Sequence, residues 1–184
     1  MRYLASPAQL RAAFLRWCLV TAPAVLALGF LSGQAAGSGP GNPWFDALAK
    51  PAAYPPPEAF GIVWSILYVL MGIALALVLA ARGASGRGAA LGAFLLQLAL
   101  NLAWSPLFFG AHQVYAALVL LAVLIVAVVA TIWLFWRVRW LAGALLLPYL
   151  AWCLFAAYLN YEFHVLNPGA ENVRENGAAV HIRL

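Results

Sequence analysis

Residues 88–136 have the sequence GAALGAFLLQLALNLAWSPLFFGAHQVYAALVLLAVLIVAVVATIWLFW, which contains no Asp, Glu, Lys or Arg. An α-helix rises about 1.5 Å per residue and needs about 20 apolar residues to cross the hydrocarbon core of a bilayer. The stretch is therefore long enough for two spans. The segment 105–113 interrupts it with Pro106, Gly110 and the polar side chains of His112 and Gln113, which provide a helix end and a turn. We expect spans near 89–109 and 114–136.

Three further charge-free stretches flank this segment. They lie between Arg16 and Asp46, between Glu58 and Arg82, and between Arg139 and Glu162. Each is long enough to cross a bilayer once. They predict helices near 12–32, 60–81 and 140–164. The sequence thus predicts an all-α membrane protein, a five-transmembrane-helix bundle.

The composition excludes most soluble classes of protein. Hydrophobic residues make up 66% of the 184 residues and charged residues only 8%, whereas soluble domains are roughly half apolar and a quarter charged. The net charge of +5 comes from arginines at the ends of apolar segments, which do not form a nucleic-acid-binding stripe. Cys18 and Cys153 lie within apolar runs, where cysteine usually packs as a small apolar residue.

The distribution of Lys and Arg predicts the orientation. Seven of the ten lie in the N-terminal tail (1–11), at the start of the first span, and in the second and fourth connections. The positive-inside rule places that side in the cytoplasm, together with the N-terminus. The first span also resembles a secretory signal, but the apolar run 17–31 is long for a signal core, which favours a retained helix.

The first connection, 33–59, is long and rich in proline. It contains Pro40, Pro43, Pro51, Pro55, Pro56 and Pro57 and cannot be helical throughout. A long, stiff loop of this kind is either a spacer or a lid over a site. The tail 168–184 is polar, and we expect it to be disordered.

Three predicted spans carry a stripe of polar and aromatic residues on one face. The residues of these stripes are Trp64 and Tyr68 in the second span, Gln97, Asn101 and Trp104 in the third, and Tyr149, Trp152 or Cys153, Ala156 and Asn160 in the fifth. Polar side chains are costly in a membrane interior, so each is expected either to have a hydrogen-bond partner or to serve a functional site. The stripes therefore predict either hydrogen bonds between helices or the walls of a ligand cavity.

The eight tryptophans separate into two groups. Trp17, Trp133, Trp136 and Trp140 lie near span ends beside arginines, which is typical of the membrane interface. Trp64, Trp104 and Trp152 are predicted to share a depth near the long loop, on which Trp44 lies. No paired carboxylates, phosphate loop, nucleophile elbow or metal-ligand spacing is present, so we assign no catalytic residue and no metal site.

Three motifs, in order, carry a resemblance to a known family. They are Asn42-Pro43-Trp44-Phe45-Asp46-Ala47-Leu48-Ala49-Lys50-Pro51 followed by Val63-Trp64-Ser65-Ile66-Leu67-Tyr68, then Gln97 to Gly110, then Pro148-Tyr149-Leu150-Ala151-Trp152 with Phe155-Ala156 and Leu159-Asn160-Tyr161. Over about residues 15–167 the chain resembles the TspO/MBR family of tryptophan-rich sensory proteins and translocator proteins.

The resemblance implies a five-helix bundle, commonly a homodimer, whose cavity is closed by the first loop. It implies porphyrin ligands such as protoporphyrin IX or haem, with no required cofactor, and the lipid bilayer and hydrophobic small molecules as partners. By motif position Trp44 and Phe45 belong to the lid. The candidate walls, from the resemblance and the stripes together, are Trp64, Tyr68, Gln97, Asn101, Trp104, Trp152, Ala156 and Asn160.

The resemblance leaves three functions open. We expect a sensory or regulatory porphyrin-binding protein; a transporter of porphyrin or another hydrophobic ligand and a light-dependent porphyrin-degrading protein are the alternatives. Relatives often have further tryptophans around the Pro-Pro of the loop, where this chain has Ala53 and Glu58, so its lid is less aromatic. Helical spans favour the bacterial cell membrane, although the outer membrane stays open.

Overall fold

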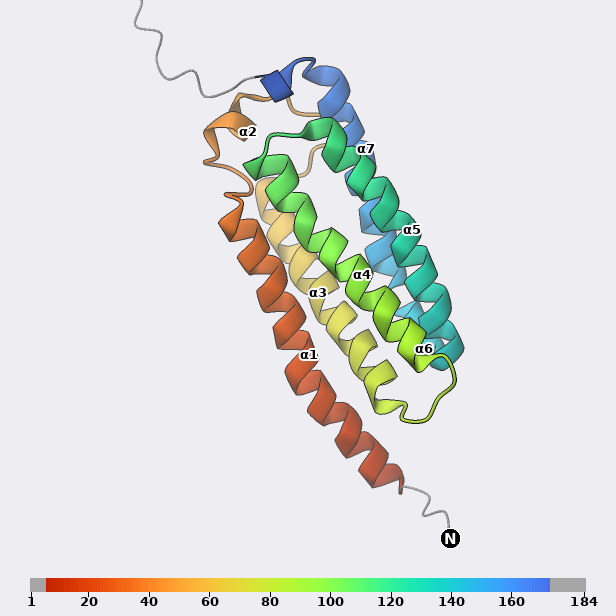
Figure 1. Ribbon diagram of the computed structural model, residues 1–184. Helices are drawn as coiled ribbons and strands as arrows, with labels where there is room; N and C mark the ends of the chain where they lie inside the picture. Colours follow the sequence, from red (N-terminus) through yellow and green to blue (C-terminus); the bar gives the residue numbers. More distant parts are fainter. Residues whose placement is uncertain (1–5, 173–184) are drawn as a thin grey trace, which may run out of the picture.

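The computed structural model describes residues 6–172. Within this range five helical segments are long and apolar enough to cross a membrane: Ala8–Ala35, Pro57–Ala80, Arg87–Gly110, Val114–Val138 and Trp140–Leu166. The predicted five-span, all-α architecture is confirmed. The spans lie side by side and alternate in direction, with the long first loop at one end of the bundle and the short α3–α4 connection at the other (Figure 1).

Helix α1 (Pro7–Ala35) is longer than predicted, because a capping box starts it early. The Ser6 hydroxyl accepts a hydrogen bond from the Gln9 backbone N–H at 3.3 Å, and the Gln9 side chain accepts one from the Ser6 N–H at 2.9 Å. Part of the predicted N-terminal tail is therefore helical. Residues 1–5 of that tail lie outside the described range.

Two prolines shape the third and fifth spans. Helix α4 (Arg87–Ser105) continues through Pro106 as a π-helical segment, η1 (Pro106–Gly110). Pro106 has no N–H for the Leu102 carbonyl oxygen, and the Ser32 hydroxyl of α1 donates to that oxygen at 2.6 Å. The fifth span, predicted as one helix, is divided into α6 (Trp140–Ala144) and α7 (Leu147–Leu166), since Pro148 cannot continue the hydrogen-bond ladder.

Helices α1 and α3 (Pro57–Ala80) approach each other closely at two glycines. A Cβ atom on Gly72 would lie 2.4 Å from the Ala22 Cα, and one on Gly29 would lie 2.1 Å from the Tyr68 ring. The Thr21 hydroxyl donates to the Gly72 carbonyl oxygen at 2.7 Å. This contact fixes the rotation of α3 about its own axis.

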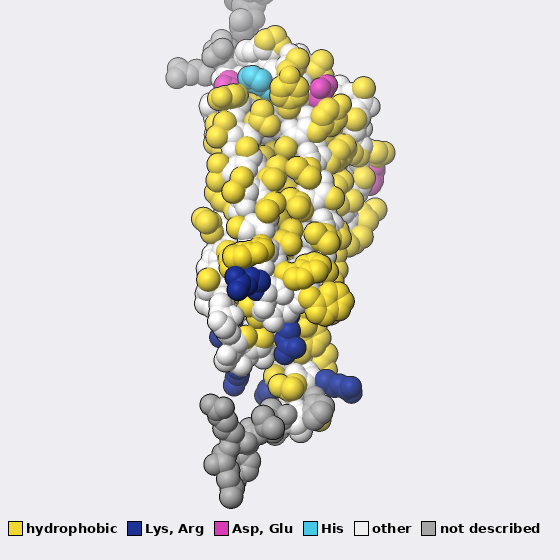
Figure 2. Space-filling view, turned by 90° about the vertical axis from the view of Figure 1, so that its right-hand side faces the viewer, with side chains coloured by type: hydrophobic (Ala, Val, Ile, Leu, Met, Phe, Trp, Pro, Cys, Tyr) yellow, Lys and Arg dark blue, Asp and Glu magenta, His cyan; other side chains and the backbone are white. Residues whose placement is uncertain are grey.

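The outer surface of the bundle is apolar along its length. Large side chains such as Leu19, Leu95 and Val126 are well exposed, as expected for residues that face lipid. Figure 2 shows a hydrophobic middle, with arginines gathered toward one end and acidic and histidine side chains toward the other. The chain is therefore an integral, multi-pass membrane protein.

The end of the bundle opposite the arginines is covered by the first loop and the start of the C-terminal segment. The loop contains a short helix, α2 (Pro43–Ala47). The 3-10 turn η2 (Ala170–Asn172) of the C-terminal segment lies beside this helix. The Trp44 indole N–H donates to the Ala170 carbonyl oxygen at 3.1 Å. The tail predicted to be disordered thus begins with residues that pack on the loop; residues 173–184 lie outside the described range.

Candidate ligand-binding cavity

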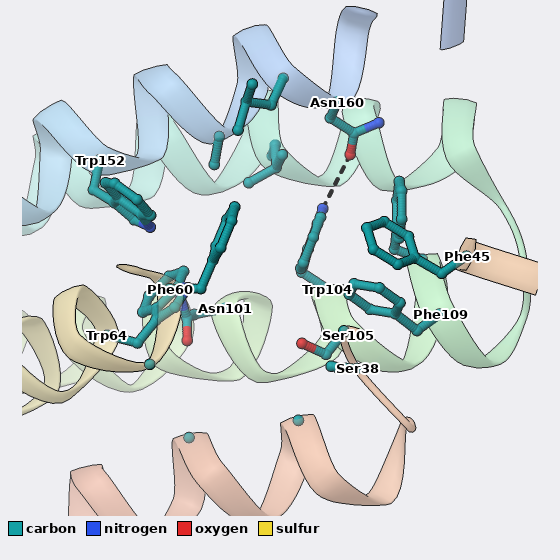
Figure 3. Close-up of a pocket in the computed structure, with 18 of the residues that line it drawn as sticks. Ser38, Phe45, Phe60, Trp64, Asn101, Trp104, Ser105, Phe109, Trp152 and Asn160 are labelled. Carbon is teal, nitrogen blue, oxygen red and sulfur yellow. Dashed lines mark hydrogen bonds between the residues drawn. The ribbon is translucent and has the colours of Figure 1, made fainter. Parts of the chain in front are cut away.

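A cavity of about 340 Å³ lies inside the bundle beneath the first loop. Its walls come from α1, α3, α4, α5 (Val114–Val138) and α7, and loop residues close its outer end (Figure 3). Pockets of a few hundred Å³ with mostly apolar walls are typical small-molecule sites.

Aromatic rings make up most of the wall. Trp64 stacks on Tyr68 with ring centroids 5.1 Å apart, and Trp104 stacks on Phe108 at the same distance. Across the cavity, Phe60 of α3 meets Trp152 of α7 edge to face at 5.8 Å. Figure 3 shows Trp64 and Trp152 on opposite sides of the same space. All three indoles therefore border the cavity while each packs on another aromatic ring of the wall.

Three hydrogen bonds between helices set the polar part of the site. The Tyr68 hydroxyl donates to Asn101 Oδ1 at 3.0 Å and so joins α3 to α4. The Trp104 indole N–H donates to Asn160 Oδ1 at 3.1 Å. The Asn160 Nδ2 in turn donates to the Val114 carbonyl oxygen at 2.9 Å. Asn160, only 2% exposed, therefore fixes the orientation of the Trp104 ring rather than offering a free group to a ligand.

Phe45 of α2 forms the inner surface of the lid. It is 2% exposed and lies against Phe109, Phe163 and Tyr54 with centroid distances from 5.1 to 6.0 Å. Asn42 caps α2, because its Oδ1 accepts from the Phe45 N–H at 3.1 Å. The lid is therefore packed in place by its own aromatic residue.

Most of the sequence-predicted residues line this one cavity. They are Phe45, Trp64, Tyr68, Asn101, Trp104, Trp152, Ala156 and Asn160. Trp44 and Gln97 lie outside it. Trp44 faces the outer side of the lid, where it stacks on His112 at 4.4 Å, because its neighbour Phe45 takes the inward direction of the short helix.

Gln97 lies deeper in the bundle than Asn101. One turn of helix separates the two residues, which corresponds to about 6 Å along α4 and places Gln97 below the cavity floor. It is 1% exposed, and neither its Oε1 nor its Nε2 has a hydrogen-bond partner among the described residues.

Several wall residues were missed by the reasoning from sequence. Phe60 and Phe108 lie four residues from Trp64 and Trp104, on the same helical faces, so the same i, i+4 rule would have identified both. Phe163 lies on α7, three residues after Asn160 and seven after Ala156, so it continues the stripe of the fifth span and the same rule reaches it. Tyr54 carries no comparable signal, since the fold of the loop brings it to the site. Within residues 6–172, no three His, Cys, Asp or Glu side chains gather in a way that could hold a metal ion.

Comparisons with known proteins agree with the family resemblance of the sequence motifs. Residues 20–166 match the model of the TspO/MBR family. The chain is 39% identical over 132 residues to the protein CrtK of Rhodobacter capsulatus, which covers 71% of this chain and 82% of that protein. It is 41% identical to the tryptophan-rich protein TspO of Chlorobaculum tepidum, over 78% of this chain and 90% of the relative. It is 43% identical to the human translocator protein, over 73% and 80% respectively.

Proposed function

Because the chain belongs to the TspO/MBR family, we propose that its loop-covered cavity binds porphyrins such as protoporphyrin IX or haem, in a sensory or regulatory role. Under this proposal the porphyrin is a ligand, and the protein needs no resident cofactor.

The observation that carries the proposal is the position of Trp64 and Trp152 on opposite walls of one apolar cavity. A flat aromatic macrocycle gains free energy from leaving water and from contact with indole faces. The Tyr68–Asn101 pair supplies a polar group at the deep end. Such a combination of apolar walls and a few polar groups suits a ligand that is large, flat and mostly apolar.

A binding experiment tests the proposal directly. Each aromatic contact contributes about 0.5–1.5 kcal/mol beyond area burial, so we expect Trp64→Leu and Trp152→Leu each to weaken protoporphyrin IX binding by about two- to tenfold. Titration of nanodisc-embedded protein, followed by the fluorescence of the bound porphyrin, measures the change.

Trp136→Leu is the matched control, because Trp136 lies at the arginine-rich end and contacts Trp140 instead of the cavity. Its affinity should equal that of the parent protein. Loss of binding in Trp136→Leu together with unchanged binding in both cavity variants would show that the porphyrin adsorbs at the lipid-facing surface.

Photochemical degradation of the ligand is a second candidate function. Trp64 and Trp152 both border the proposed porphyrin site, where an excited ring could exchange an electron with an indole. Aerobic illumination of the complex, followed by product analysis, distinguishes the two functions: degradation should slow in Trp152→Leu at equal porphyrin occupancy, whereas a pure binding protein yields the same products as free porphyrin.

We also propose an orientation and an assembly. Arginines at the ends of α1, α3, α4 and α5 favour a cytoplasmic position for that end, with the N-terminus inside and the lid outside, in the bacterial cell membrane. A homodimer is proposed from family membership alone.

A further inference from the structure

The lid, residues 36–56 between α1 and α3, is held mainly by the segment that follows α7. Within residues 6–172, its backbone pairs reach only one another and the adjoining ends of α1 and α3. Four hydrogen bonds join it to the rest of the described chain, and three of them go to the segment 167–170. They are one from Trp44 to Ala170, two between Asn167 and Ala49, and one from Asn42 to Phe109, the longest at 3.4 Å.

Asn167 pairs with Ala49 as a second backbone would. Its Oδ1 accepts from the Ala49 N–H at 2.8 Å, and its Nδ2 donates to the Ala49 carbonyl oxygen at 3.1 Å. Only an amide side chain offers a neutral donor and an acceptor side by side in this way. Asn167 is also the residue that ends α7, where its backbone N–H and its Nδ2 both donate to the Phe163 carbonyl oxygen. The last turn of α7 therefore sets the position of the amide.

Trp44 provides the second contact, on the outer side of the lid. Its ring is buried and stacks on His112 at 4.4 Å, and its indole N–H donates to the Ala170 carbonyl oxygen at 3.1 Å. Helix α2 is therefore held between the bundle on one side and the C-terminal segment on the other. Figure 1 shows α2 and the start of this segment at the same end of the molecule.

The segment itself is attached to the bundle at both ends. It leaves α7 at Asn167, and the Glu171 Oε1 accepts from the Tyr115 backbone N–H at 2.6 Å, in the first turn of α5. Gln113, the residue before α5, makes no side-chain cap of its own, so Glu171 satisfies one of the free N–H groups there. The lid therefore binds to a segment that two spans hold in place.

We infer that residues 167–171 form a latch on the lid, and that Asn167 is a positioning residue that keeps the lid closed over the cavity. Neither Asn167 nor Ala170 lines the cavity, so the latch controls access to the site without contacting what is bound there. The inference goes beyond the proposed function, because it concerns the rate at which any ligand passes the lid end.

A native thiol tests the latch without porphyrin. Cys153 is buried and lines the cavity. In Cys18→Ala protein in nanodiscs, its modification by a small, permanently charged methanethiosulfonate, followed by mass spectrometry, measures how often the lid opens to water. Asn167→Ala removes both bonds to Ala49 and should raise this rate by about five- to fiftyfold.

Two further variants keep this test decisive. Trp44→Phe keeps an aromatic ring against His112 but removes the bond to Ala170, so it should raise the rate by about two- to tenfold. Gln113→Ala is the matched control, because it removes an exposed amide at the same end that has no side-chain partner among the described residues. Its rate should equal that of the parent. Parent rates in both Asn167→Ala and Trp44→Phe, or equal acceleration in Gln113→Ala, overturn the latch.

Stopped-flow binding of protoporphyrin IX separates the latch from the site. In Asn167→Ala the association and dissociation rate constants should rise together, by about the same factor as the Cys153 rate, while Kd stays within about twofold of the parent value. A raised Kd with an unchanged association rate would mean that Asn167 shapes the site instead, and the latch would be wrong. If the parent binds no porphyrin but Cys153 still reacts faster in Asn167→Ala, the proposed function fails and the latch stands.

Discussion

Asn101 and Gln97 are amide side chains one turn apart on α4, and their surroundings differ. Asn101 borders the cavity, and its Oδ1 accepts from the Tyr68 hydroxyl at 3.0 Å. Gln97 is buried below it with no partner among residues 6–172 for either polar atom. The two residues should therefore respond in opposite ways to the same substitution.

Asn101→Leu is expected to lower the free energy of unfolding by about 0.6–2 kcal/mol, because it leaves the buried Tyr68 hydroxyl without its acceptor. The loss should be smaller when Tyr68→Phe is already present, since the hydroxyl is then absent. A double-mutant cycle of thermal unfolding in detergent measures this coupling. Additive effects of the two substitutions would mean that the bond between α3 and α4 contributes nothing to stability.

Gln97→Leu is expected to leave stability unchanged or to raise it by about 1 kcal/mol, since it replaces two unpaired polar atoms by an apolar group of similar size. Porphyrin affinity should also stay unchanged, because Gln97 lies outside the cavity. The same unfolding and titration measurements used for Asn101→Leu apply. A clear drop in stability would reveal a hydrogen-bond partner for the Gln97 amide.

At the scale of the elements, the contact between α1 and α3 depends on the absence of a side chain at Gly72. A Cβ atom there would lie 2.4 Å from the Ala22 Cα and 2.9 Å from the Thr21 carbonyl oxygen, both backbone atoms that cannot rotate away. Helix α3 carries Phe60, Trp64 and Tyr68 into the cavity wall. A shift of α3 against α1 should therefore change the cavity as well as the stability.

Gly72→Ala is expected to lower the free energy of unfolding by about 1–3 kcal/mol, the usual cost of overpacking. Porphyrin affinity should fall with it. Gly92→Ala on α4 is the matched control, because nothing lies within 4 Å of a Cβ atom there. In that position alanine should be neutral or stabilising by up to about 1 kcal/mol, since glycine weakens a helix interior. Equal effects of the two variants would exclude close helix packing as the cause.

At the scale of the whole molecule, the described arginines and acidic residues lie at opposite ends, with Lys50 at the lid end as the one described lysine. The arginines Arg11, Arg16, Arg82, Arg87, Arg137 and Arg139 lie toward the end with the α3–α4 connection, and the acids Asp46, Glu58, Glu162 and Glu171 lie toward the lid end. Arg87 also donates to the carbonyl oxygens of Val78 and Leu79 at 3.1 Å and so caps α3. An excess of Lys and Arg favours the cytoplasmic side.

Single cysteines test this orientation. In a background of Cys18→Ala and Cys153→Ala, we expect Ser85→Cys in the α3–α4 connection to react only after the cell membrane is permeabilised. Ala52→Cys in the first loop should react with an impermeant maleimide in intact cells. Both positions are exposed, so access to the thiol does not differ between them. Labelling of both from the same side would refute the crossing of the membrane by α3, and the reverse pattern would refute the proposed orientation.

The site was only partly predictable from sequence, as particular residues show. Trp64, Trp104 and Trp152 could be placed at a common depth, because span direction and rise per residue set the height of each side chain. Trp44 and Gln97 belong to the motifs but do not line the cavity, whereas Tyr54 lines it without a local signal. In an apolar helix every face is hydrophobic, so hydropathy does not report its rotation.

The sequence by itself determined the five spans, the alternation of their direction and the family. The length of the charge-free stretches and the order of the motifs are local properties of the chain. Only the tertiary structure decided which aromatic side chains meet. Contacts such as Gly72 against Ala22 set the rotation of α3, and the folding of the first loop turns Phe45 inward and Trp44 outward. These arrangements depend on packing between segments far apart in sequence, which no local pattern encodes.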